Sequence, residues 1–170
     1  AAVRHGAAVG AVQVALTLIA YIVNTSWLFD PWFGVSSWVL IFVGMYLALK
    51  GIRQEEGDVL PFRRAWGHAY VVAGVNTFIV IGFSVVLYHV IDPSLVGLAV
   101  RISMERIEEV AALMGGSEEI AAAFEQMEPE IRKGLSPAGQ AMSGVWSLVF
   151  YAIPTLIMAL VMRRKEDFGA

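Results

Sequence analysis

Four long stretches of this chain contain no Asp, Glu, Lys or Arg, and this feature constrains the fold more than any other. They cover residues 5–29, 31–49, 65–91 and 134–162, with lengths of 25, 19, 27 and 29 residues. A helix needs about 20 apolar residues to cross the hydrocarbon core of a bilayer. The pattern therefore predicts an all-α polytopic membrane protein with four transmembrane helices and not a soluble helical bundle.

The overall composition agrees with a chain that lies mostly in lipid. Its 170 residues are 58% hydrophobic and 16% charged, whereas soluble domains are usually about 25% charged. The net charge of −3 is too small to indicate a nucleic-acid partner. The chain contains no Cys, which excludes disulfides, thiolate metal ligands and Cys nucleophiles.

The distribution of basic residues predicts how the spans are oriented, because Lys and Arg are enriched in cytoplasmic loops. With four crossings, eight of the 12 basic residues fall on the side that holds both termini. The opposite side receives four basic and nine acidic residues, a net charge of −5. We therefore expect the N- and C-termini to be cytoplasmic and residues 92–137 to face outward. The first stretch is too long for the apolar core of a signal peptide and is expected to be retained.

We predict a single membrane domain over residues 1–170, with spans near 7–29, 32–50, 66–91 and 138–162. Residues 93–136 are predicted to form an outward-facing amphipathic helical hairpin between the third and fourth spans. Asp92, Pro93 and Ser94 are typical of a helix start. The pair Gly115 and Gly116 is typical of a helix end.

A second outer helix is expected to begin after Ser117 and to end near Gly134 and Pro137, with Pro129 kinking or interrupting it. Its apolar residues recur at helical spacing on one face. Since the segment is acidic, this face is expected to pack on itself or on a protein partner. The residues predicted to form the partner surface are Ile120, Phe124, Met127 and Ile131.

The spans contain polar residues that lack charge. In hydrocarbon such groups must find internal partners, so we expect them to form hydrogen bonds between helices. A polar path for a substrate is the alternative. The residues concerned are Gln13, Asn76, Ser143 and Ser147.

Arg63 and Arg64 precede the third span and are candidates for contacting anionic lipid headgroups, although they could serve only to set the topology. We find no arrangement of residues typical of a nucleotide site, a nucleophile or a metal site. No cofactor, no metal and no catalytic residue is predicted.

Three segments carry a resemblance to a known family. They are Gly-Asp-Val-Leu-Pro-Phe-Arg-Arg-Ala-Trp at residues 57–66, Tyr-His-Val-Ile-Asp-Pro at 88–93, and Leu-Ser-Pro at 135–137. Together they resemble the family catalogued as domain of unknown function 4199, which consists of small four-span bacterial membrane proteins. The resemblance covers most of the chain, best over residues 57–165. It implies the four-span topology and a place in the bacterial inner membrane, and it implies no activity.

Three functions remain open at this point. The first is a non-catalytic accessory or scaffold subunit of a larger membrane complex, with lipids and either protein partners or further copies of the chain around it. The second is a small oligomeric transporter or channel. The third is an interfacial enzyme acting on lipid through His68 or His89, which has the least support because no carboxylate or Ser lies at a suitable spacing.

Overall fold

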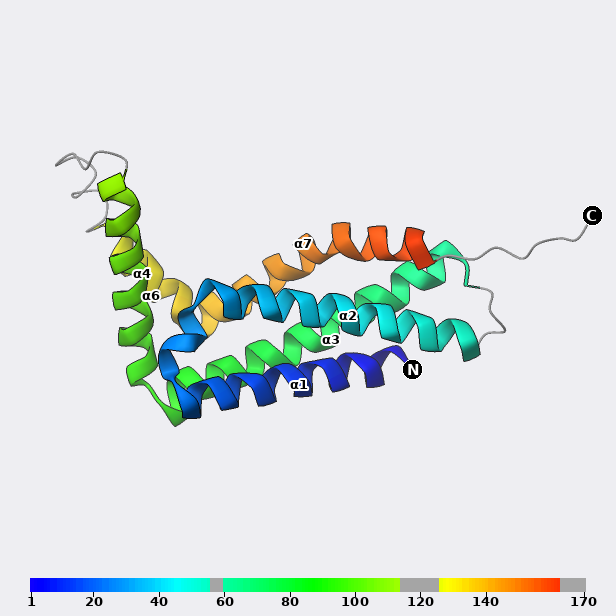
Figure 1. Ribbon diagram of the computed structural model, residues 1–170, viewed down its shortest axis with the longest axis horizontal. Coiled ribbons are helices and arrows are strands. Elements are labelled where there is room, and N and C mark those ends of the chain that lie inside the picture. The colour runs from blue at the N-terminus through cyan, green and yellow to red at the C-terminus, as the bar shows by residue number, and fades with distance from the viewer. Residues whose placement is uncertain (56–59, 114–125, 163–170) are drawn as a thin grey trace, which may run out of the picture. The chain divides into compact units, whose positions relative to one another are not determined.

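A computed structural model describes residues 1–55, 60–113 and 126–162 of the chain. Its helices are shown in Figure 1. In chain order they are α1 (Ala2–Val23), η1 (Thr25–Phe29), α2 (Pro31–Glu55), α3 (Phe62–Val86), η2 (Leu87–Ile91), α4 (Ser94–Leu113), α6 (Met127–Leu135) and α7 (Pro137–Met162). The element η1 is a 3₁₀ helix and η2 is a π-helical turn. The described residues contain no β-strand, so the predicted all-α class is confirmed.

Four of these helices are long and apolar enough to cross a membrane, as predicted. They are Ala2–Val23, Pro31–Glu55, Phe62–Ile91, which joins α3 to η2, and Pro137–Met162. Only 17% to 28% of the most apolar window of each helix is buried within the chain. Most of the apolar surface of every span is therefore left for lipid or for another protein.

The first two spans are joined by a capped turn. The side chain of Asn24 accepts a hydrogen bond of 3.0 Å from the backbone N–H of Ser26, and Asn24 itself is extended. The regular helix therefore ends at Val23, and the last part of the expected first span forms η1. Asp30 then accepts a 3.0 Å bond from the N–H of Trp32. Pro31 opens α2, a position where its missing N–H costs nothing.

The chain divides into two compact units, and α3 and α7 pass from one to the other. The first unit comprises Ala1–Val80 and the residues from Gly144 onward. Its core is made by apolar side chains, most of which come from three helices. They are Ile41, Met45, Ala48, Leu49 and Ile52 of α2, Ala65, Ala69, Val72 and Ala73 of α3, and Ala159 and Met162 of α7, together with Ala2 of α1 and Leu60.

Glycines bring α1 close to its neighbours in this unit. A Cβ placed on Gly6 would lie 2.8 Å from the carbonyl oxygen of Val72 in α3, and one on Gly10 would lie 3.1 Å from Ile79. A Cβ on Gly44 of α2 would overlap the side chain of Val9. Because lipid provides no hydrophobic driving force for helix association, transmembrane helices pack through close van der Waals contact at small residues. The small residues of α1 therefore contact helices of the same chain.

The second unit, Ile81–Ser143, holds the end of α3, η2, α4, α6 and the start of α7. Asp92 accepts bonds from the N–H and the hydroxyl of Ser94, so the expected helix start is found there. Pro129 is the third residue of α6 and does not interrupt this helix, because residues in the first turn have no intrahelical N–H partner to lose. The predicted sites at Gly115, Gly116, Ser117, Ile120 and Phe124 lie outside the described residues.

Candidate functional site: the cleft between α4 and α6

The helix α4 has an apolar face and a charged face. Its buried residues are Leu95, Ala99, Val100 and Ala111. On the charged face, the Nε of Arg101 lies 3.8 Å from a carboxylate oxygen of Glu105, one turn further along the helix. The helix therefore presents charge to solvent and small apolar side chains to its own unit.

The helix α6 is short, and its charges are arranged to stabilise it. Glu128 and Glu130 lie in the first turn, and Arg132 and Lys133 lie in the last turn. This order is favourable, because the acidic side chains lie at the positive end of the helix dipole and the basic side chains lie at its negative end. Glu128 and Arg132 form a hydrogen-bonded ion pair of 3.1 Å. The spacing of four residues was visible in the sequence and is the signal that would have predicted this pair.

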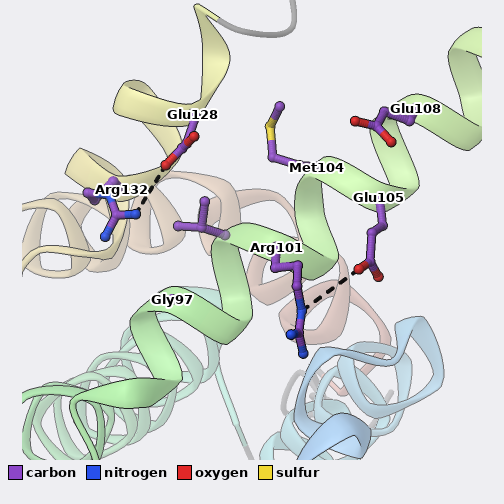
Figure 2. A pocket seen from close by; sticks show the side chains of 8 residues that line it. Gly97, Arg101, Met104, Glu105, Glu108, Glu128 and Arg132 are labelled. Atoms are coloured by element: carbon purple, nitrogen blue, oxygen red, sulfur yellow. Dashed lines mark hydrogen bonds and ion pairs between the residues drawn. The ribbon is translucent and has the colours of Figure 1, made fainter.

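A cleft of about 400 Å³ lies between these two helices (Figure 2). In the close-up, Glu128 and Arg132 lie on α6 and Met104 and Glu108 lie on the side of α4 that faces it, whereas Glu105 turns toward Arg101 and away from α6. A Cβ placed on Gly97 would meet nothing within 4 Å, so this edge of the cleft is open. The complete lining is Gly97, Val100, Arg101, Met104, Glu105, Glu108, Glu128 and Arg132.

The cleft has two charge pairs and one further carboxylate. The side chains of the two pairs are 48% to 68% exposed, and exposed pairs on one helix are typically worth only about 0.3–0.5 kcal/mol. Glu108 forms no ion pair with any residue in the described part of the chain. The lining therefore carries a formal charge of −1, from two Arg and three Glu, and it also includes the apolar side chains of Val100 and Met104.

An elbow connects α6 to α7 at one end of this unit. The carbonyl oxygen of Leu135 lies 3.0 Å from Nε2 of His89 and accepts a 2.9 Å bond from Nε2 of Gln140. Gln140 is 7% exposed, and its Oε1 has no hydrogen-bond partner among the described residues. A Cβ on Gly139 would overlap the carbonyl oxygens of Lys133 and Gly134. Neither His89 nor Gln140 was predicted to act here, since the contact joins residues far apart in the sequence.

The polar residues predicted within the spans have different surroundings. Gln13, 7% exposed, donates a 2.8 Å bond from Nε2 to the carbonyl of Ser37 in α2. Asn76 is 3% exposed, and its Oδ1 has no partner in the described ranges. Ser143 donates within its own helix to Gly139, and Ser147 is half-buried.

The candidate lipid-contacting residues Arg63 and Arg64 are exposed in the first turn of α3. An aromatic ladder that was not predicted runs along the same helix. The rings of Phe62 and Trp66 are stacked with centroids 6.5 Å apart, and those of Trp66 and Tyr70 are 6.4 Å apart. Spacing of four residues between aromatics is the sequence signal for such a ladder.

The remaining members of the predicted partner surface lie on α6. Met127 is 44% exposed and Ile131 is half-buried. On α4, Val110 and Leu113 are also exposed. The end of α4 and the start of α6 thus both carry apolar side chains in contact with solvent.

These features together define a polytopic α-helical membrane protein whose loop between the third and fourth spans folds into helices of its own. The chain belongs to the family described as protein of unknown function (DUF4199), whose model matches residues 4–164. No curated protein and no solved structure matches the chain.

Proposed function

We propose that this protein is a non-catalytic accessory or scaffold subunit of a larger membrane complex, and that its outer helices bind the partner. The observation that carries the proposal is the exposed apolar surface on α6, represented by Met127, in a segment that is otherwise charged. Exposed apolar groups framed by charge are typical of protein interfaces.

The chemistry of the spans supports the same role. The four uncharged runs contain no carboxylate, Lys or Arg, and pumps and ion pathways usually place such groups within the membrane. Gly6, Gly10 and Gly44 already pack against other helices of the same chain, so they are not free to pack against a partner. Docking within the membrane would therefore use the large apolar side chains that remain exposed on the spans.

Site-specific photo-crosslinking tests the partner surface. A crosslinking amino acid at Met127 is expected to capture one defined protein, or a second copy of this chain, in cells at native expression. The matched control is the same amino acid at Lys133, which lies on another face of α6. Recovery of only the uncrosslinked monomer from both positions would contradict the proposal, as would equal capture from both.

We further propose that the protein lies in the bacterial inner membrane with its termini in the cytoplasm and residues 92–137 outside. The excess of basic residues beside the termini supports this orientation. Since the chain has no Cys, single cysteines can be introduced at Gln54 and Glu109. An impermeant maleimide is expected to label position 109 in intact cells whose outer membrane is permeable, and position 54 only after lysis.

A small oligomeric transporter is the second candidate, and Asn76 favours it. A buried amide oxygen without a partner is uncommon, and a passing solute would supply a donor. Solute flux into proteoliposomes should then fall when Asn76 is replaced by Leu. Equal flux for wild type and Asn76→Leu over several solutes would argue against transport.

A further inference from the structure

The helix α6 has few interactions along its length that hold it in place. None of its nine residues is buried. Its ion pairs, Glu128 with Arg132 and Glu130 with Lys133, join residues of α6 to one another and not to a neighbouring helix. A helix this short is not stable by itself in water, and segments with few buried contacts open at a lower free energy than their surroundings. The position of α6 therefore depends on the few contacts that fasten it.

Two side chains fasten the C-terminal end of α6. The carbonyl oxygen of Leu135, the last residue of this helix, lies 3.0 Å from Nε2 of His89 in η2 and accepts a 2.9 Å bond from Nε2 of Gln140 in α7. We call this pair of bonds the Leu135 latch. Both donors belong to helices long and apolar enough to span the membrane, so the latch ties a short helix to two long ones. The π-helical turn that carries His89 is a local feature often found at functional sites.

The closed latch leaves one polar group without a partner. Gln140 is 7% exposed, and its Oε1 is buried and has no hydrogen-bond partner among the described residues. A buried acceptor without a donor lowers stability, because it has lost its bonds to water. If the end of α6 moves away, water can reach this oxygen. The unpaired oxygen therefore offsets part of what the two donated bonds contribute, and the closed state is only weakly favoured.

The apolar residue Val100 of α4 faces α6. It is 5% exposed, and it lines the space between the two helices together with Glu128 and Arg132 of α6 (Figure 2). The preceding residue, Ala99, is 4% exposed but does not line this space. Successive residues of a helix point about 100° apart, so movement of α6 would expose Val100 and leave Ala99 covered.

We propose that α6 is a lid over the apolar face of α4, that the Leu135 latch holds it closed, and that it opens while the rest of the second unit stays folded. Opening exposes the side chain of Val100 and lets water reach Oε1 of Gln140, and it leaves Ala99 covered. The proposal does not depend on the accessory role, since opening is a property of this chain alone. In a subunit of that kind, the lid would regulate the access of a partner to α4.

Single cysteines measure this opening, because the chain has no Cys of its own. Val100→Cys, Ala99→Cys and Val110→Cys are made in the full chain, and each is labelled with a maleimide in a non-ionic detergent. Val110 is 55% exposed and gives the rate for an accessible thiol. We expect position 110 to react fastest, position 100 more slowly and position 99 slowest. Equal rates at positions 99 and 100 would overturn the proposal, because the unit would then open only as a whole. Equal rates at positions 100 and 110 would also overturn it, because α6 would then not cover Val100.

Two variants of His89 test the latch. Leu and Gln both keep much of the bulk of the imidazole, but only the amide Nε2 of Gln can replace Nε2 of His89 as a donor to Leu135. His89→Leu is expected to speed the labelling of Val100→Cys about fivefold, from the loss of one hydrogen bond. His89→Gln is expected to leave that rate unchanged, and neither variant should change the labelling of Ala99→Cys. The proposal is overturned if Leu and Gln have equal effects, if Leu has no effect, or if the rate rises as much at position 99 as at position 100.

Discussion

The Nε2 atom of His89 lies 3.0 Å from the main-chain oxygen of Leu135. A carbonyl oxygen can only accept, so the imidazole carries its proton on Nε2 and donates it. Because η2 carries His89 and α6 ends at Leu135, this bond attaches the end of the third span to the elbow before the fourth. Gln140 donates to the same oxygen.

Replacing His89 by Ala should therefore loosen α6. The loss of one part-buried hydrogen bond costs about 1 kcal/mol, and amide hydrogen exchange in residues 127–135 should become about fivefold faster. The control is His68→Ala, because His68 is also half-buried but makes no hydrogen bond within the described part of the chain. Unchanged exchange in α6 after His89→Ala would show that the bond does not hold the elbow.

The elbow itself should depend on Gly139. Any Cβ at this position overlaps the carbonyl oxygens of Lys133 and Gly134, so the backbone must move. We expect Gly139→Ala to lower the free energy of unfolding by about 1–3 kcal/mol. At Gly134 an added Cβ meets nothing within 4 Å, and Gly134→Ala should be neutral or stabilising by up to about 1 kcal/mol. Thermal unfolding in detergent compares the two; equal effects would refute the steric account.

Composition and local capping rules predicted much of this fold. The four uncharged runs locate the spans, Asp92 marks the start of α4, and Gly134 with Pro137 marks the elbow. These predictions succeed because the length of apolar runs and the chemistry of caps are local properties. The early end of α1 at Asn24 was missed because an uncharged polar residue does not interrupt a count of charges.

Contacts between distant segments could not be predicted in the same way. Gln13 was expected to bond another helix, but nothing in the sequence names Ser37 as its acceptor. The role of Gly44 was also not anticipated, since its meaning depends on the side chain of Val9 lying against it. The cleft requires α4 and α6 to lie side by side, which no spacing along the chain determines.

The close contact between Gly44 and Val9 predicts a loss of stability that a second substitution should reverse. Gly44→Ala should destabilise the protein by about 1–3 kcal/mol, because the new methyl group overlaps the stiff side chain of Val9. Adding Val9→Ala removes the overlapping atoms and should restore most of the lost stability. Gly67→Ala, where an added Cβ meets nothing within 4 Å, is the control. If Val9→Ala does not restore the stability lost in Gly44→Ala, the loss does not come from overlap with the side chain of Val9.

Substitution by Leu should have opposite effects on the stability of the protein at Gln13 and at Asn76. Gln13→Leu removes the 2.8 Å bond to Ser37 and leaves that carbonyl without its side-chain donor, at a cost of about 0.6–2 kcal/mol. Asn76→Leu removes a buried oxygen that has no partner in the described ranges, and removing such a group is neutral or stabilising, by up to about 2 kcal/mol. Reversible unfolding in bicelles measures both variants under the same conditions. Asn76→Leu could instead destabilise the protein as much as Gln13→Leu does. That result would show that the amide oxygen of Asn76 accepts a hydrogen bond in the membrane, from a donor on a bound solute or on a second chain.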